Sequence, residues 1–119
     1  MTNATIFHNP ACGTSRSVLA ALTEAGLAPT VVPYLKTGWT PDQLLTLCAQ
    51  LGTGPRAILR LQGTPAKDLG LDQPRVSDEA LIAAMVAHPQ LVNRPIVVIG
   101  TRAALCRPAD RVKALMALG

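Results

Sequence analysis

The hydrophobic pattern of the first third of the chain predicts a strand, a helix and a second strand. Residues 4–7 form a short run that is typical of a buried strand. An apolar stripe at helical spacing follows, made by Val18, Leu19, Leu22 and Leu27. Gly26 marks the end of this helix, and residues 30–34 alternate weakly as a second strand. Because a helix connects the two strands, we expect them to be parallel with a right-handed crossover.

The middle of the chain carries two helical patterns separated by loops. Residues 36–39 predict a loop, and a capping box at residues 40–43, with proline at the first helical position, begins a helix. Residues 56–61 form a short segment that brings its two arginines to one face if it is helical. Residues 62–76 are rich in glycine, proline and polar side chains and predict a loop. Ser77 and two acidic residues then begin another helix.

The last quarter of the chain predicts a hairpin and a final helix. Residues 96–99 are a continuous apolar strand, and Gly100-Thr101 turns into a second strand that ends near Cys106. Arg107-Pro108 is predicted to open the last helix. The order is therefore β-α-β, a helical insertion, and β-β-α. This order predicts an α/β fold.

Length and composition favour one domain that spans residues 1–119. The chain is long enough for a core but short for two ordinary domains. It is 49% hydrophobic but only 3% aromatic, so leucine, valine, isoleucine and alanine must build that core. No apolar run approaches the roughly 20 residues that span a membrane, and no signal-peptide pattern is present. We therefore expect a monomer with no membrane partner.

The charge of the chain indicates the kind of ligand that it binds, and its cysteines indicate its cellular compartment. The net charge is +4, and ten of the eleven basic residues are spread from Arg16 to Arg111 without a run, which favours a small anionic ligand over nucleic acid. Cysteines at positions 12, 48 and 106 match neither a disulfide framework nor a zinc site. We expect a cytoplasmic protein with no metal, in which Cys48 packs in the core.

Cys12 is the candidate reactive residue. It lies at or just before the predicted start of a helix, where unpaired backbone N–H groups and the helix dipole favour a thiolate and can hold an oxyanion. A neighbouring His8 or Arg16 would favour the thiolate further. The alternative is an inert buried cysteine. The flanking proline, glycine, threonine, serine and arginine indicate a polar, shaped loop instead.

Four sequence blocks carry a family resemblance. They are His8-Asn9-Pro10-x-Cys12-Gly13-Thr14-Ser15-Arg16, Pro55-Arg56-Ala57-x-Leu59-Arg60, Asn93-Arg94-Pro95-Ile96-Val97-Val98 and Cys106-Arg107-Pro108. Together they resemble the glutaredoxin-coupled arsenate reductases, and the order of elements resembles the thioredoxin fold. The resemblance implies a thioredoxin-like fold with a helical insertion between its two halves.

The resemblance also implies a role for each site residue. Cys12 attacks arsenate, and the position matching His8 helps to set the acidity of the thiol. Three arginines, Arg60, Arg94 and Arg107, hold the oxyanion. The backbone of Gly13, Thr14 and Ser15 supplies the anion seat at the helix start, and Pro95 follows a cis peptide bond. Guanidinium groups suit this role because they donate paired hydrogen bonds to tetrahedral oxyanions.

In the implied cycle the other thiols come from outside. Glutathione, a co-substrate and not a bound cofactor, joins the arsenic on Cys12, glutaredoxin removes the glutathione, and arsenite leaves. A second protein thiol is the alternative, because Cys106 precedes Arg107 and an internal disulfide with Cys12 would complete the reduction. Such a bond needs Cα atoms within roughly 7 Å.

Two other functions fit parts of the pattern. A regulator of the Spx type, which binds RNA polymerase, shares this fold but needs no oxyanion pocket. A monothiol member of the family with another substrate also fits the Cys12-to-Ser15 string. Val18 excludes the Cys-x5-Arg loop of phosphatase-like arsenate reductases, and Ser15 excludes a Cys-x-x-Cys dithiol.

Overall fold

The computed structural model describes residues 3–118 and contains two units. The sheet unit comprises the described residues up to Thr37 and those from Arg94 onward, and the helical unit comprises Gly38–Asn93. The helical unit thus interrupts the sheet unit in the sequence, as expected of an insertion. In the described part of the chain, every helix falls short of the length and hydropathy that crossing a membrane requires.

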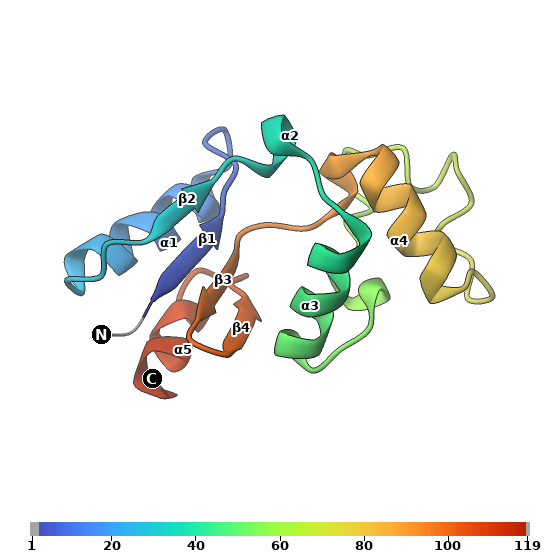
Figure 1. Ribbon diagram of the computed structural model, residues 1–119. Coiled ribbons are helices and arrows are strands. Elements are labelled where there is room, and N and C mark those ends of the chain that lie inside the picture. The colour runs from blue at the N-terminus through green and yellow to red at the C-terminus, as the bar shows by residue number, and fades with distance from the viewer. Residues whose placement is uncertain (1–2, 119) are drawn as a thin grey trace. The chain divides into compact units, whose positions relative to one another are not determined.

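Four short strands form a mixed sheet in the sheet unit (Figure 1). They are β1 (Ala4–Phe7), β2 (Thr30–Val32), β3 (Ile96–Ile99) and β4 (Arg102–Leu105). Their order is β2-β1-β3-β4. The pair β1 and β2 is parallel, which confirms the predicted crossover unit, and β3 and β4 form the predicted antiparallel hairpin. Strand β3 also pairs antiparallel with β1 and so joins the two halves of the sheet.

Helices α1 (Gly13–Glu24) and α5 (Arg111–Leu118) cover one face of this sheet (Figure 1). Alternate residues of β1 and β3 point to that face, as the two-residue period of a strand requires. The buried cluster between helices and sheet consists of Ala4, Ile6, Val18, Leu22, Val97, Ile99, Cys106, Val112 and Leu115. Small and branched aliphatic side chains therefore build this core, as the composition predicted.

The helical unit is built from α3 (Pro41–Leu51), a 3₁₀ turn at Pro55–Ile58 and α4 (Asp78–Ala87). The predicted capping box is present, because the Thr40 hydroxyl accepts from the Gln43 N–H while the Gln43 side chain accepts from the Thr40 N–H. Ser77 caps α4 by accepting from the Ala80 N–H, also as predicted. Both helices begin at the residues that local capping chemistry predicts.

Two predicted boundaries are wrong. Strand β2 ends at Val32, and α2 (Tyr34–Thr37) replaces the predicted strand end and loop, because the Pro33 carbonyl accepts the N–H groups of two following residues. The last helix begins at Arg111, not at Pro108, because residues 108–113 first form a turn with bonds between residues three apart. The condition set for residues 56–61 is met only in part, because the 3₁₀ turn ends at Ile58 and Arg60 lies outside it.

Candidate active site

Cys12 occupies the N-cap of α1, directly before the first helical residue, as predicted. Its backbone is extended, with φ −94° and ψ 122°. The Cys12 N–H donates to the Asn9 carbonyl at 3.0 Å, and the Cys12 carbonyl accepts from the Arg16 N–H at 3.0 Å. The residue is 9% exposed. The sulfur is therefore held at the positive end of the helix and is nearly buried.

The pairing of the strands brings two arginines to the thiol. Strand pairing sets Ile96 opposite Leu105, so the residues just before β3 and just after β4 meet at one end of the hairpin. The Cys106 N–H donates to the Pro95 carbonyl at 2.9 Å and extends this pairing. Phe7 also pairs with Ile96, so β1 leads into the Cys12 loop at the same end. Residues 12, 94 and 107 are therefore neighbours in space.

Arg107 contacts both Cys12 and Arg94. Its Nη1 donates to the Cys12 Sγ at 3.6 Å and to the Arg94 carbonyl at 3.1 Å. The Arg94–Pro95 peptide bond is cis, as the resemblance implied, and Pro95 is buried. The Arg107–Pro108 bond is also cis, which the sequence did not indicate. Each arginine of the pair is thus placed next to a cis proline.

The surroundings of Cys12 favour its thiolate. Burial by itself raises the pKa of the Cys12 thiol, but the Ser15 backbone N–H and the side chains of Arg94 and Arg107 outweigh burial and lower the pKa to about 7. The Cys12 side chain makes no capping hydrogen bond at the start of α1. The N–H groups of the first turn act instead on the negative charge of the thiolate, because they have no partner within the helix. About half of the Cys12 side chains are therefore ionised near neutral pH.

The first turn of α1 begins directly after Cys12. Gly13, Thr14 and Ser15 are the first three helical residues, and the N–H groups of a first turn face away from the helix body. Gly13 is exposed, Thr14 is half-buried and Ser15 is fully buried. The role of these three residues in binding an oxyanion stays a prediction, and the Ser15 hydroxyl is bonded to His8 and to the Asn9 N–H.

His8 contacts Ser15. His8 Nδ1 and Ser15 Oγ share a hydrogen bond of 2.6 Å, and the Asn9 N–H donates to the same Oγ at 3.1 Å. Burial and the charge of Arg16 lower the pKa of His8, so its ring is neutral near pH 7. The expectation that His8 or Arg16 assists the thiol stays a prediction. Two arginines that lie far away in the sequence, Arg94 and Arg107, lower the pKa of Cys12.

Two further hydrogen bonds stabilise the loop between β1 and Cys12. The Ala11 N–H donates to Asn9 Oδ1 at 3.0 Å, and Arg16 Nη1 donates to the Pro10 carbonyl at 2.8 Å. Sequence reasoning assigned no role to Asn9, although asparagine before proline is a turn signal that could have identified it. Arg16 is exposed and serves this loop. Both residues shape the segment that presents Cys12.

Comparison with known proteins identifies the family to which this arrangement belongs. Residues 7–115 match the ArsC family. The chain belongs to the ArsC family. An arsenate reductase of Escherichia coli is 48% identical over 114 residues, which cover 94% of this chain and 79% of that relative. An arsenate reductase of Rhizobium meliloti is 51% identical over 110 residues, which cover 91% of this chain and 77% of that relative.

A solved structure supports the same assignment for this ArsC-family chain. The arsenate reductase of Vibrio cholerae superposes with a TM-score of 0.90 at 41% identity, and the match covers 95% of this chain and 97% of that one. The fold is thus the thioredoxin-like α/β fold of the ArsC family, which confirms the predicted fold class. The helical unit is the insertion between its two halves.

Arg60 belongs to the helical unit of this ArsC-family chain. Its Nε donates to the Gln62 carbonyl at 3.1 Å, and its Nη1 donates to Asn93 Oδ1 at 3.0 Å. Cys12 and the arginine pair beside it belong to the sheet unit. The role of Arg60 in holding the oxyanion stays a prediction.

The other two cysteines of this ArsC-family chain lie in apolar surroundings. Cys48 is 7% exposed on α3, and burial and the charge of Asp78 raise the pKa of its thiol. Cys106 is fully buried in the cluster under α1 and α5, and burial raises the pKa of its thiol to about 11. Both thiols are therefore protonated near neutral pH. Within residues 3–118, no group of three or more His, Cys, Asp or Glu side chains could hold a metal ion.

Proposed function

We propose that this chain is an arsenate reductase whose nucleophile is the Cys12 thiolate. The observation that carries the proposal is the nearly buried sulfur at a helix start, with its pKa lowered to about 7 beside two guanidinium groups. A thiolate with a pKa near ambient pH attacks well, and adjacent guanidinium groups attract a tetrahedral oxyanion. Relatives about half identical over most of the chain are named arsenate reductases, which supports this substrate over the Spx-type alternative.

In the proposed first step, the Cys12 sulfur forms a bond to As(V), and one arsenic–oxygen bond breaks with loss of water. Arg94 and Arg107 hold the remaining oxygens by charge-assisted hydrogen bonds, and Arg60 completes the set. The N–H groups of Gly13, Thr14 and Ser15 bind the oxyanion at the helix start. His8 acts through Ser15, whose hydroxyl links the two ends of the loop around Cys12.

The electrons of the proposed reaction come from two external thiols. Glutathione displaces a second oxygen as water and forms a second sulfur–arsenic bond. The glutaredoxin thiolate then attacks the glutathione sulfur, which gives a mixed disulfide and leaves two electrons on arsenic as As(III). Water releases arsenite and regenerates Cys12. In total, arsenate and two thiols give arsenite, one disulfide and water.

The proposal extends to the setting of the enzyme. We infer that it works in the cytoplasm as a monomer and as a single functional domain, with arsenate, glutathione and glutaredoxin as its partners. It needs no bound cofactor, because each thiol of the cycle is either Cys12 or is supplied from outside.

Arsenite release tests the proposed function. Purified protein is incubated with arsenate, glutathione and glutaredoxin, and arsenite is measured over time. Wild type and the matched control Cys48→Ser are expected to release arsenite, whereas Cys12→Ser is expected to release none above the background without enzyme. Arsenite release by Cys12→Ser at the wild-type rate would contradict the proposal, as would an inactive wild type.

A further inference from the structure

The Arg60 guanidinium is held from two directions within the helical unit. Gln62 offers its backbone carbonyl to Nε at 3.1 Å, and Asn93 offers its side-chain Oδ1 to Nη1 at 3.0 Å. Both Arg60 and Asn93 are half-buried. A guanidinium carries only donors, so the Asn93 atom that faces it must be the oxygen. Two acceptors at different nitrogens fix the plane of the guanidinium.

The backbone brings Asn93 beside Arg60 without help from the Asn93 side chain. Leu59 and Val92 form an antiparallel bridge. On one side of it the Arg60 N–H donates to the Leu91 carbonyl at 2.7 Å, and on the other the Asn93 N–H donates to the Ile58 carbonyl at 2.7 Å. These bonds remain when the Asn93 side chain is removed. A substitution at this position therefore changes the contact and leaves the two paired segments in place.

The Arg60 backbone is also fastened on its carbonyl side. The Thr64 hydroxyl donates to the Arg60 carbonyl at 2.7 Å. The Arg60 main chain is thus bonded at both its N–H and its carbonyl. What remains to be fixed is the long side chain, which loses considerable rotamer freedom whenever it binds a ligand. Fixing it beforehand reduces the cost of binding.

The chemistry of the acceptor matters as much as its position. A carboxylate at position 93 would form a charged pair with Arg60 and would cancel much of the field that attracts an anion. The amide oxygen of Asn93 accepts the same hydrogen bond without a net charge. An asparagine therefore orients the guanidinium and leaves its positive charge in place.

We propose that Asn93 is a positioning residue that holds the Arg60 guanidinium through an uncharged oxygen, ready to bind an oxyanion. The holding of Arg60 stands on the contacts within the helical unit, whereas its purpose rests on the proposed arsenate reductase function. Asn93 itself touches no reacting atom. Its effect is exerted through Arg60, so removing Arg60 must abolish it.

The kinetic test uses Asn93→Ala, Asn93→Asp and the control Asn3→Ala, in the full chain. Asn93→Ala is expected to raise the KM for arsenate about tenfold with a smaller change in kcat, as loss of a hydrogen bond to a charged group allows. Asn93→Asp is expected to raise KM because its charge competes with arsenate. In an Arg60→Ala background, Asn93→Ala should add nothing further. An unchanged KM in Asn93→Ala, or an equal rise in the Arg60→Ala background, would overturn the inference.

A second readout is independent of activity. Nitrogen NMR of arginine side chains reports the rotation of the Arg60 guanidinium about its Nε–Cζ bond. We expect slow rotation in wild type, Asn3→Ala and Asn93→Asp, and faster rotation in Asn93→Ala. Equal rotation in wild type and Asn93→Ala would show that Asn93 does not hold Arg60. If wild type releases no arsenite, the proposed function fails, and this readout alone decides whether Asn93 positions Arg60.

Discussion

Replacing Arg107 with methionine should raise the pKa of the Cys12 thiol. Arg107 Nη1 lies 3.6 Å from the sulfur and is one of the groups that favour the thiolate against the effect of burial. Methionine has a similar length and no charge, so Arg107→Met removes the electrostatic contact and keeps much of the volume. The thiol should then be harder to ionise.

The size of the effect follows from the lowered pKa. A fall from the ordinary 9.0 to about 7 corresponds to about 3 kcal/mol in favour of the Cys12 thiolate. Removing one of the favourable contributors should raise the pKa to about 8. At pH 7 the ionised fraction then falls from about one half to about one tenth. A thiolate of higher pKa is also about threefold more nucleophilic, so the alkylation plateau at high pH should rise while its midpoint moves up.

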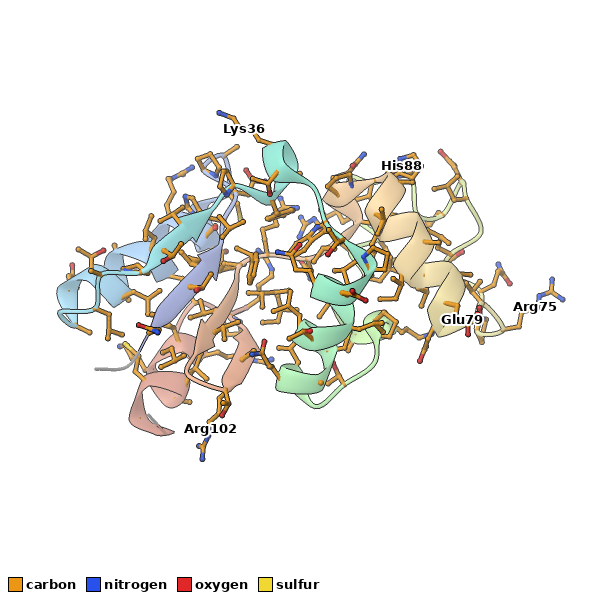
Figure 2. All side chains as sticks on the ribbon, in the orientation of Figure 1. Lys36, Arg75, Glu79, His88 and Arg102 are labelled. Atoms are coloured by element: carbon orange, nitrogen blue, oxygen red, sulfur yellow. The ribbon has the colours of Figure 1, made fainter. Side chains whose placement is uncertain are left out.

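The rate of Cys12 alkylation as a function of pH measures both the midpoint, which gives the pKa of the thiol, and the plateau at high pH. Iodoacetamide labelling is followed by mass spectrometry of the Cys12 peptide, which separates it from Cys48 and Cys106. The control is Arg102→Met, because Arg102 is exposed and extends away from the ribbon (Figure 2). Wild type and Arg102→Met should share a midpoint near pH 7, and Arg107→Met should lie near pH 8. A wild-type midpoint close to 9, or an unmoved midpoint in Arg107→Met, would refute the reasoning.

Two further predictions concern the guanidinium forks and the pH dependence of stability. Arg94→Lys and Arg107→Lys should each lose at least about tenfold in arsenite release while staying folded, because lysine cannot replace a planar fork. The exposed controls Arg75→Lys and Arg102→Lys (Figure 2) should keep the wild-type rate. Equal losses in all four variants would show that arsenite release depends on the arginine side chain in general and not on Arg94 and Arg107 in particular. Because the folded pKa of Cys12 is below its unfolded value of 9.0, its stabilising effect is full above pH 9 and is lost as pH falls through 7. In urea unfolding, the free energy of unfolding of wild type relative to Cys12→Ser should rise by about 2 to 3 kcal/mol from roughly pH 6 to pH 10. A difference between the two proteins that does not change with pH would contradict this.

The regular elements could be predicted because their signals are local. Apolar periodicity identified β1, α1 and the β3–β4 hairpin, and capping residues placed the starts of α3 and α4. The errors lie where hydrogen bonds of turns decide the structure. Pro33 lies within the predicted strand, but its carbonyl accepts the first hydrogen bonds of α2. Arg107-Pro108 predicts the start of α5, but a turn precedes the helix.

The site could be predicted in part. The sequence placed Cys12 at a helix start, because helix starts have recognisable residues. The local pattern could not show which cation lies beside the sulfur, since Arg107 is 95 residues away and reaches it only through strand pairing. Only the family resemblance assigned Arg94 and Arg107 to the site of Cys12. The nearby His8 was the more obvious candidate, yet it is buried against Ser15 and neutral. Burial and long-range pairing are the two properties that a local pattern does not report.

The most direct test of the central claim is arsenite release by a chain whose only thiol is Cys12. The variant Cys48→Ser/Cys106→Ala suits it, with alanine at the fully buried position so that no hydroxyl is placed in the core. It should reduce arsenate at close to the wild-type rate with glutathione and glutaredoxin, and should not turn over with thioredoxin alone. Turnover of wild type with thioredoxin alone, together with loss of activity in Cys106→Ala, would contradict the account and make Cys106 the second redox thiol.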